Sequence, residues 1–205
     1  MIAIIDYDAG NLKSVEKALA YIGEKAVITR DKHELLGADK VILPGVGSFG
    51  DAMGKLQSYD LIDTIKEIVA KEVPFLGICL GLQLMFESSE ESPGVKGLSL
   101  LPGKILRIPD CPGLKIPHMG WNSLEITPSS VQGARLFRNL GEEPYVYFVH
   151  SYYLKAEDEA IVAASTQYST HIHASVEKGN LFACQFHPEK SGETGLQILK
   201  NFAAI

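Results

Sequence analysis

The segment Pro74–Met85, PFLGICLGLQLM, most constrains what this chain can fold into. Phe75–Ile78 is a short apolar run, typical of a buried strand, and the apolar residues after Gly81 are compatible with a helix. A sharp strand–turn–helix connection of this kind presents a nucleophile above the end of a sheet, and Gly77 and Gly81 let the backbone around Cys79 bend tightly. A helix beginning directly after Cys79 would also point its amide groups at the sulfur, which favours the thiolate. The same pattern fits a small cysteine buried in a core, so the rest of the chain must distinguish the two readings.

Short apolar runs alternate with helical periodicity in the first part of the chain, before and around this segment. The strands predicted there are Met1–Ile5, Ala26–Thr29 and Lys40–Leu43, and the helices predicted are Leu12–Ile22, Asp31–Gly37 and Leu56–Val73, with Asn11 or Ser14 as the first helix cap. This alternation predicts an α/β fold with a mostly parallel sheet whose two faces are covered by helices.

The second part of the chain has shorter strand-like pieces separated by Pro and Gly. After a polar loop at Glu87–Gly97, whose charges we expect to be solvated, the predicted strands are Lys104–Ile108, Ser123–Ile126, Tyr145–Val149, Ile161–Thr166, Ala174–Glu177 and Leu181–Gln185, and a helix closes the chain at Gly192–Ala204. We expect these strands to add antiparallel pairs to the parallel core, within one domain that spans residues 1–205.

Composition excludes several classes of function. The net charge is −6 and no run of Lys and Arg is present, which argues against a nucleic-acid-binding protein. Three cysteines without a C-x-x-C pair indicate a reducing compartment, and the first residues lack the basic leader of a signal peptide. No apolar run is long enough for a membrane span, so we expect a cytoplasmic protein without a membrane partner. His171 and His173 have no third ligand at a suggestive spacing, so we expect surface or loop histidines and neither a metal site nor a cofactor.

Two further segments supply the groups that a nucleophilic cysteine needs. His187 follows a predicted buried strand and Glu189 lies two residues beyond it, so His187 is the candidate base and Glu189 the residue that orients it. The Pro44–Gly47 loop follows the third predicted strand, where ligand sites lie in doubly wound sheets. Its amides, together with the amide after Cys79, are candidate donors for an oxyanion, so the three segments predict cleavage of an acyl or amide bond through a thioester.

The residues around Cys79 and the His187-Pro188-Glu189 segment resemble the class I glutamine amidotransferases, which use a Cys-His-Glu triad. Further segments resemble one family within this class, the glutaminase subunits of imidazole glycerol phosphate synthase. These segments are Asp6–Tyr7 with Gly10–Leu12, Pro44–Gly50, Pro93–Leu98, Pro117–Asn122, Tyr147–Tyr152 and Gln185–Ser191. The resemblance covers nearly the whole chain and departs mildly at Asp8-Ala9, where relatives commonly have Gly and Met.

The resemblance implies a flavodoxin-like α/β domain that hydrolyses glutamine to glutamate and ammonia. Its partner would be a (β/α)8-barrel cyclase subunit, in a heterodimer with lyase-type activity. The cyclase would use the ammonia to form imidazole glycerol phosphate, for histidine biosynthesis, and an aminoimidazole carboxamide ribotide. Carried over residue by residue, the resemblance assigns the oxyanion position to Val46, Gly47 and Leu80, the glutamine contacts to Gln83, Ser151 and Tyr152, and the partner interface to Trp121, Asn122 and Lys190.

Three alternatives stay open from the sequence. The chain could be the glutaminase subunit of another amidotransferase, although the Pro117–Asn122 segment disfavours this. It could be a non-catalytic module on the same fold, against which the intact Cys79, His187 and Glu189 argue. A cysteine peptidase is the third, and it gives no reason for the segments around Gln83 and Trp121.

Overall fold

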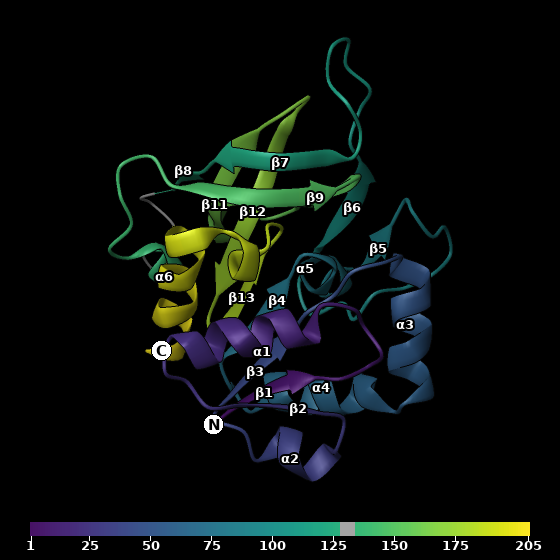
Figure 1. The fold of residues 1–205 in the computed structure, drawn as a ribbon. Helices are drawn as coiled ribbons and strands as arrows, with labels where there is room; N and C mark the ends of the chain where they lie inside the picture. Colours follow the sequence, from purple (N-terminus) through teal and green to yellow (C-terminus); the bar gives the residue numbers. More distant parts are fainter. Residues whose placement is uncertain (128–133) are drawn as a thin grey trace.

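The computed structural model describes residues 1–127 and 134–205, which build a central sheet of eight strands with helices on both faces (Figure 1). The strand order is β2-β1-β3-β4-β13-β12-β11-β8. The strands of this sheet are β1 (Ile2–Ile5), β2 (Ala26–Thr29), β3 (Lys40–Leu43), β4 (Phe75–Ile78), β8 (Glu125–Ile126), β11 (Val162–Gln167), β12 (His171–Lys178) and β13 (Leu181–Cys184). The helices are α1 (Leu12–Tyr21), α2 (Lys32–Leu36), α3 (Phe49–Ser58), α4 (Leu61–Ala70), α5 (Leu80–Leu84) and α6 (Gly192–Ala203).

The five strands from β2 to β13 are parallel, and their order is that of the flavodoxin-like doubly wound sheets. From β1 the chain first adds β2 on one side and then crosses to add β3 on the other, so the topological switch point lies between β1 and β3. Ligands of such sheets bind beyond the carboxyl ends of the strands near this switch point. The loops after β1, β3, β4 and β13 meet there, so the fold itself selects these four loops as the place to look for a site.

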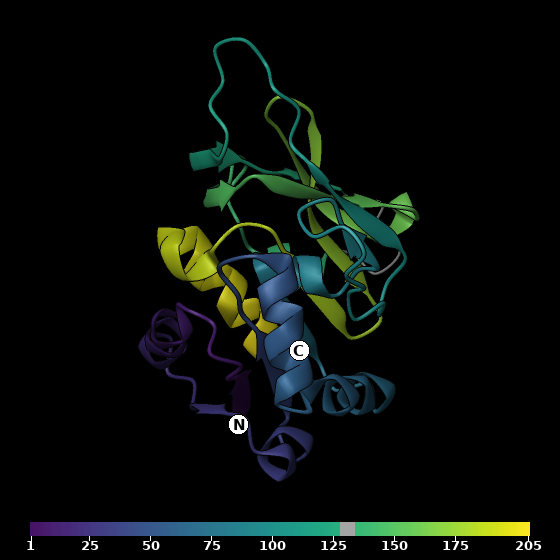
Figure 2. The same cartoon turned by 90° about the vertical axis from the view of Figure 1, so that its right-hand side faces the viewer.

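Alternating side chains of the parallel strands pack into two separate hydrophobic cores, one on each face of the sheet. Ala3 and Ile5 of β1 pack with buried residues of α2, α3 and α4, whereas Ile2 and Ile4 pack with buried residues of α1 and α6. Figure 2 shows these two groups of helices on opposite sides of the sheet. Burying each isoleucine of β1 stabilises the fold by about 1.5–3 kcal/mol, which is why the apolar runs predicted the strands correctly.

The antiparallel part extends the sheet through β12, β11 and β8 and adds two smaller sheets. These consist of β10 (Tyr152–Ala156), β6 (Gly103–Arg107) and β5 (Ser88–Ser89), and of β7 (His118–Ser123) and β9 (Tyr145–His150). The connection from β6 to β7 projects from the end of the molecule in both views (Figures 1 and 2). The predicted mostly parallel sheet with added antiparallel strands is therefore confirmed.

Some predicted boundaries are wrong, each for a local reason. The helix predicted at Leu56–Val73 is two helices, because the chain turns at Asp60, which has a left-handed φ of 53°. The preceding helix α3 was not predicted, since two glycines obscure its pattern, although Ser48 caps it by accepting a hydrogen bond from Asp51 N at 3.3 Å. Strand β10 was also not predicted, and the strand expected at Ser123–Ile126 is divided between β7 and β8.

The sequence predicts a solvated surface at the acidic loop Glu87–Gly97, but its carboxylates bond to the backbone of neighbouring elements. Carboxylates of Glu87, Glu90 and Glu91 accept hydrogen bonds from the backbone amides of Gly103, Arg107 and Phe49, at 3.1, 2.7 and 2.7 Å. These side chains tie the loop to β6 and to the start of α3, so three of its acidic residues have a structural role. Within the described ranges, no helix is long and apolar enough to cross a membrane.

Candidate active site

Cys79 lies on the sharp turn between β4 and α5, as the sequence predicts. Its backbone has φ 54° and ψ −107°, a strained conformation for a residue with a side chain, and its amide donates to Cys184 O at 2.8 Å. The turn needs glycine nearby: a Cβ on Gly81 would lie 1.8 Å from Leu43 O, and one on Gly77 would lie 2.8 Å from Gly81 O. The two glycines therefore let α5 pack directly on the ends of β3 and β4 and so fix the position of the sulfur.

His187 and Glu189 come from the end of β13 and the short 3-10 helix Pro188–Lys190 that follows it. His187 Nδ1 lies 2.7 Å from Glu189 Oε1, and both side chains are fully buried. Within residues 1–127 and 134–205, the other ring nitrogen, Nε2, has no hydrogen-bond partner, and neither does Glu189 Oε2. His187 and Cys79 line the same cavity. The structure therefore brings the three predicted triad residues together and leaves Nε2 available for a reacting group.

The electrostatics of this group favour a charged His187. Burial alone would lower the pKa of the ring, but its interactions with the Cys79 sulfur and the Glu189 carboxylate outweigh burial and raise the pKa of His187 to about 9. His187 is then an imidazolium at neutral pH, the state that can stabilise a thiolate at once and donate a proton to a leaving group later.

The predicted oxyanion and substrate residues all line this cavity, which has a volume of about 380 Å³, suitable for a small molecule. The lining residues are Val46, Gly47, Cys79, Leu80, Gln83, Glu91, Pro117, Val149, His150, Ser151, Tyr152 and His187. The residues assigned to a partner interface, Trp121, Asn122 and Lys190, are not among them. Trp121 and Lys190 are exposed and Asn122 is half-buried on β7, outside the cavity.

The loop Pro44–Gly47, the candidate oxyanion loop, contacts the turn at Cys79 directly. Gly45 O accepts a hydrogen bond from Leu80 N at 3.3 Å, so in this conformation the amide after Cys79 is engaged by the loop. A Cβ on Gly45 would lie 2.4 Å from the Tyr7 hydroxyl, and Gly47 has a left-handed φ of 105°. Only glycine fits the first position, and glycine gives the second its orientation at low cost.

Gln185 is a fully buried residue beside Cys79 to which no role was assigned from the sequence. Its Nε2 lies 3.7 Å from Cys79 Sγ, and its Oε1 accepts a hydrogen bond from Gln83 Nε2 at 3.2 Å. Gln83 Nε2 also donates to Tyr152 O at 3.0 Å. The two glutamines thus connect the nucleophile to the predicted substrate residues, and the signal for Gln185 was its place at the end of β13, two residues before His187.

Asn11 is the second residue that the sequence analysis did not place at the site. We expected it as a possible helix cap, but its φ is 77° and its side chain makes no cap hydrogen bond. Its amide instead donates to Glu189 Oε1, the atom that also bonds His187. Its position directly after Gly10, at the carboxyl end of β1, was the available signal.

Two buried histidines continue from the substrate residues towards β7. His150 Nδ1 lies 2.8 Å from Tyr152 O, and His150 Nε2 lies 3.0 Å from His118 Nδ1. His118 Nε2 lies 3.4 Å from Asn122 Nδ2. Burial lowers the pKa of His118 to about 4 and that of His150 to about 3, with the neighbouring histidines adding to the effect at His150. Both rings are neutral, so each donates from Nδ1 and accepts at Nε2, and the chain of hydrogen bonds has one direction.

The prediction that His171 and His173 are surface or loop histidines is correct for one of the two only. His171 is exposed on β12, but His173 is buried and its Nδ1 accepts a hydrogen bond from Ala156 N at 3.2 Å. In the part of the chain that the structure describes, no group of three His, Cys, Asp or Glu residues is arranged to hold a metal ion.

Comparison with known proteins gives relatives over the full length of the chain. The family model for glutamine amidotransferase class-I matches residues 3–205. The imidazole glycerol phosphate synthase subunit HisH of Thermosynechococcus vestitus is 50% identical over 205 residues, covering 100% of this chain and 96% of that protein. The HisH subunits of Bacillus cereus strain G9842 and Methanocaldococcus jannaschii are 51% and 48% identical, each covering 100% of this chain and 95% and 100% of theirs.

Solved structures share the fold at lower identity. A crystal structure of a glutamine amidotransferase matches with a TM-score of 0.75 at 19% identity, covering 99% of this chain and 100% of the other. The structure of PurLQS from Thermotoga maritima matches with a TM-score of 0.72 at 22% identity, covering 99% and 97%. The chain belongs to the class I glutamine amidotransferases and, within them, to the family of HisH subunits of imidazole glycerol phosphate synthase.

Proposed function

We propose that this chain hydrolyses glutamine to glutamate and ammonia through a Cys79 thioester, as the glutaminase subunit of imidazole glycerol phosphate synthase. The observation that carries the proposal is the position of Cys79 on a strained turn, in one cavity with the buried His187–Glu189 pair. Family membership selects glutamine as the substrate. The three groups supply the nucleophile, the proton carrier and the residue that orients the proton carrier, which are the three roles in a catalytic triad.

In the first half of the reaction, the Cys79 thiolate attacks the side-chain amide carbon of glutamine and forms the C–S bond. The carbonyl electrons move to oxygen, where the Gly47 and Leu80 amides are the assigned donors. His187 Nε2 gives its proton to the amide nitrogen, the C–N bond breaks, and ammonia leaves. Glu189 holds the ring through Nδ1, so Nε2 keeps its aim when the charge on the ring changes.

In the second half, a water molecule attacks the thioester carbon and His187 Nε2 takes one of its protons. The C–S bond then breaks, glutamate forms, and Cys79 returns to the thiolate with His187 protonated again. We assign the glutamine contacts to Gln83, Ser151 and Tyr152, because all three line the cavity beside Cys79. No group other than the chain's own residues and water is needed for either half.

The oxyanion loop gives a physical reason for dependence on a partner. Leu80 N donates to Gly45 O at 3.3 Å, so this donor becomes free only when the loop moves or its peptide turns. We propose that the isolated chain favours this engaged state, and that partner contacts shift the population towards a state whose amides face the oxyanion. The isolated chain is then nearly inactive although its triad is assembled.

The partner that we propose is a (β/α)8-barrel cyclase subunit, in a heterodimer with lyase-type activity. It would receive the ammonia and form imidazole glycerol phosphate and an aminoimidazole carboxamide ribotide, in histidine biosynthesis. The exposed Trp121 supports an interface at β7, because exposed tryptophan is enriched in interface hot spots, and Asn122 and Lys190 are the other residues that we assign to this interface. We also propose that residues 1–205 act as one domain and that the complex is cytoplasmic, which agrees with three free cysteines.

The test is glutamate release from glutamine by the chain alone and by the chain mixed with a barrel cyclase and its nucleotide ligand. We expect activity in the mixture, little activity in the chain alone, and none in Cys79→Ala. Cys111→Ala is the matched control, since Cys111 is a free cysteine that does not line the cavity. Activity that is indifferent to the cyclase would favour another acceptor enzyme, and equal activity in Cys79→Ala would refute the mechanism.

A further inference from the structure

The loop Tyr7–Asn11, between β1 and α1, contacts the catalytic residues on its inner side. Asn11 donates its side-chain amide to Glu189 Oε1. Gly10 packs so closely on the oxyanion loop that a Cβ there would lie 2.7 Å from Val46 Cγ2. The Tyr7 hydroxyl donates to Pro44 O at 2.7 Å. A displacement of this loop would therefore reach both the triad and the oxyanion loop.

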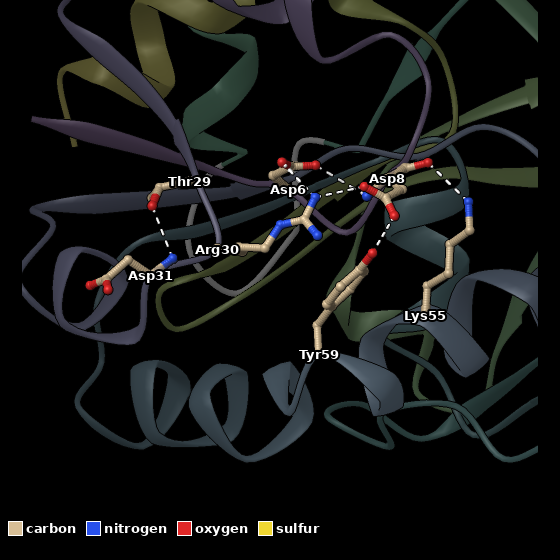
Figure 3. A network of polar contacts seen from close by, with 7 residues as sticks. All are labelled: Asp6, Asp8, Thr29, Arg30, Asp31, Lys55 and Tyr59. Atoms are coloured by element: carbon tan, nitrogen blue, oxygen red, sulfur yellow. Dashed lines mark hydrogen bonds and ion pairs between the residues drawn. The ribbon is translucent and has the colours of Figure 1, made fainter.

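On its outer side the same loop is held at one residue, Asp8, whose side chain and backbone are all engaged (Figure 3). Asp8 Oδ1 accepts from Arg30 Nη2 at 2.6 Å, and Oδ2 accepts from the Tyr59 hydroxyl. Asp8 O accepts from Lys55 Nζ at 3.0 Å, and Asp8 N donates to Asp6 Oδ1 at 3.1 Å. We call Asp8, Arg30, Tyr59 and Lys55 the Asp8 anchor.

The anchor joins the Tyr7–Asn11 loop to two segments that are distant from it in the sequence. Arg30 follows β2, Lys55 belongs to α3, and Tyr59 lies in the turn between α3 and α4. The Arg30 guanidinium lies over the Tyr59 ring at 4.1 Å and also bonds Asp6 Oδ2 at 2.8 Å, so it lies between the two carboxylates (Figure 3). These contacts hold Asp8 from several directions, which a single surface ion pair does not do.

The anchor holds Asp8 in a left-handed backbone conformation. Its φ is 60°, in the left-handed region that favours glycine and that aspartate occupies at a cost. The Asp8 side chain is half-exposed, so its ion pair with Arg30 contributes little to global stability. A strained residue held by several weak contacts on the outer side of the loop indicates that the position of the loop matters more than the stability gained.

We infer that the Asp8 anchor is a positioning device for catalysis: it fixes the Tyr7–Asn11 loop so that Asn11 holds Glu189 against His187. The inference rests on the proposed glutaminase function for its rate measurements. Asp8 itself touches no reacting atom and acts through Asn11. The glutamine contacts assigned to Gln83, Ser151 and Tyr152 lie on other elements, so the anchor affects the chemical step and leaves glutamine binding unchanged.

The test replaces Asp8 by glycine, which adopts a φ of 60° without strain and removes both carboxylate contacts. In the complex with the cyclase and its nucleotide ligand, we expect kcat for glutamate release to fall by about 10-fold with KM unchanged, since small misplacements of catalytic groups cost this much or more. Arg30→Gln should give the same pattern. Glu67→Gln, which breaks the exposed Lys71–Glu67 pair on α4, is the matched control and should leave kcat and KM as in the wild type.

A double variant separates positioning from general destabilisation. We expect Asn11→Ala to lower kcat by about 10-fold or more, and Asp8→Gly to cause no further loss in the Asn11→Ala background, because both act on the same contact to Glu189. Losses that multiply in the double variant would overturn the inference. So would a kcat within twofold of wild type in Asp8→Gly, or a change confined to KM.

A second readout keeps this test distinct from that of the proposed function. The rate at which iodoacetamide alkylates Cys79, followed against pH, depends on the thiolate–imidazolium pair and needs no glutamine turnover. Asp8→Gly should slow alkylation at neutral pH and move the profile to higher pH, whereas Glu67→Gln should not. If the wild-type complex releases no glutamate, the proposed function fails and this profile alone decides the inference. An unchanged profile in Asp8→Gly would overturn it.

Discussion

The buried pair His118 and His150 makes the stability of this protein depend on pH in a predictable direction. Their side chains are 3% and 6% exposed, and the pKa values of about 4 and about 3 lie below that of an ordinary histidine. His118 is also stacked between Phe148 and Tyr168, with ring centroids at 4.7 and 4.0 Å. A proton on either ring would place two N–H groups face to face in the hydrogen-bond chain, so the folded state excludes it.

The direction in which stability changes with pH follows from the number of protons bound by the folded and the unfolded chain. Below about pH 6.5 the unfolded chain takes up a proton at each of these histidines and the folded chain does not, so stability is fully present above about pH 6.5 and falls as the pH drops. At about pH 5 the loss is about 2 kcal/mol for each histidine, because the two pH values differ by about 1.5 units and each unit is about 1.4 kcal/mol. His187 acts in the opposite direction above about pH 6.5, because its raised pKa adds stability as the pH falls from about 7.5, but this contribution is the same in the wild type and in His118→Gln and cancels when the two are compared.

The assay is urea unfolding at about pH 7.5 and about pH 5, in the wild type and in His118→Gln. Glutamine can still donate an N–H to His150 but cannot take up a proton. We expect the difference in unfolding free energy between the two pH values to shrink by about 2 kcal/mol in His118→Gln. His33→Gln, at an exposed position on α2, is the control and should keep the wild-type difference. An undiminished difference in His118→Gln would show that His118 is protonated in the folded state and would refute the reasoning.

Three other results are expected. Gly81→Ala should lower the unfolding free energy in urea by about 3 kcal/mol or more, because its Cβ would lie 1.8 Å from Leu43 O. Gly54→Ala, in α3, should raise it by about 0.5–1 kcal/mol, because among the described residues a Cβ there would meet no atom within 4 Å outside its own stretch of helix. Equal effects of the two changes would contradict the packing argument. Trp121→Ala should weaken cyclase binding by about 2 kcal/mol, measured by calorimetry, without changing the urea midpoint. Gln185→Leu should reduce kcat/KM for glutamine by about 10-fold, since it removes the contacts to the thiol and to the second glutamine, and an unchanged value would exclude a role for this side chain.

Much of the parallel core could be predicted from apolar runs and turn residues alone. Strands buried on both faces must be continuously apolar, so β1, β3 and β4 stand out in the sequence. Periodicity failed at Asp60 because the apolar residues from Leu56, in the last turn of α3, run on into the helical spacing of α4. A single left-handed residue divides the helix without disturbing that pattern.

The contacts that complete the site could not be predicted, because they join distant parts of the chain. Asn11 and Glu189 are 178 residues apart in sequence, and Gln185 is 106 residues from Cys79. Local patterns carry no information on which side chains a sheet brings together at its edge. His118 illustrates the same limit: nothing beside it in the sequence indicates that Phe148 and Tyr168 enclose it.

Two sets of contacts lead from the surface towards the cavity, one through the backbone of the Tyr7–Asn11 loop and one through a chain of hydrogen bonds, and they end on different parts of the proposed reaction. The Asp8 anchor ends, through Asn11, on Glu189, which orients the base. The chain from Asn122 through His118 and His150 ends on Tyr152 O, which also accepts from Gln83. One connection thus governs the proton carrier and the other the assigned substrate contacts.

This division makes the two connections separable by kinetics. Loss of the Asp8 anchor should lower kcat at constant KM. His118→Gln keeps an N–H donor to His150 but loses the stacked ring that holds this donor in place, so the hydrogen bond from His150 to the Tyr152 carbonyl should weaken. We expect KM for glutamine to rise by a few-fold, about 1 kcal/mol for one weakened neutral hydrogen bond, and kcat to stay nearly constant. Glutamate release measured over a range of glutamine concentrations in the cyclase complex distinguishes the patterns. If His118→Gln lowered kcat as Asp8→Gly does, the base and the substrate contacts would move as one unit, because a residue that only supports ground-state binding cannot change the barrier from the bound state.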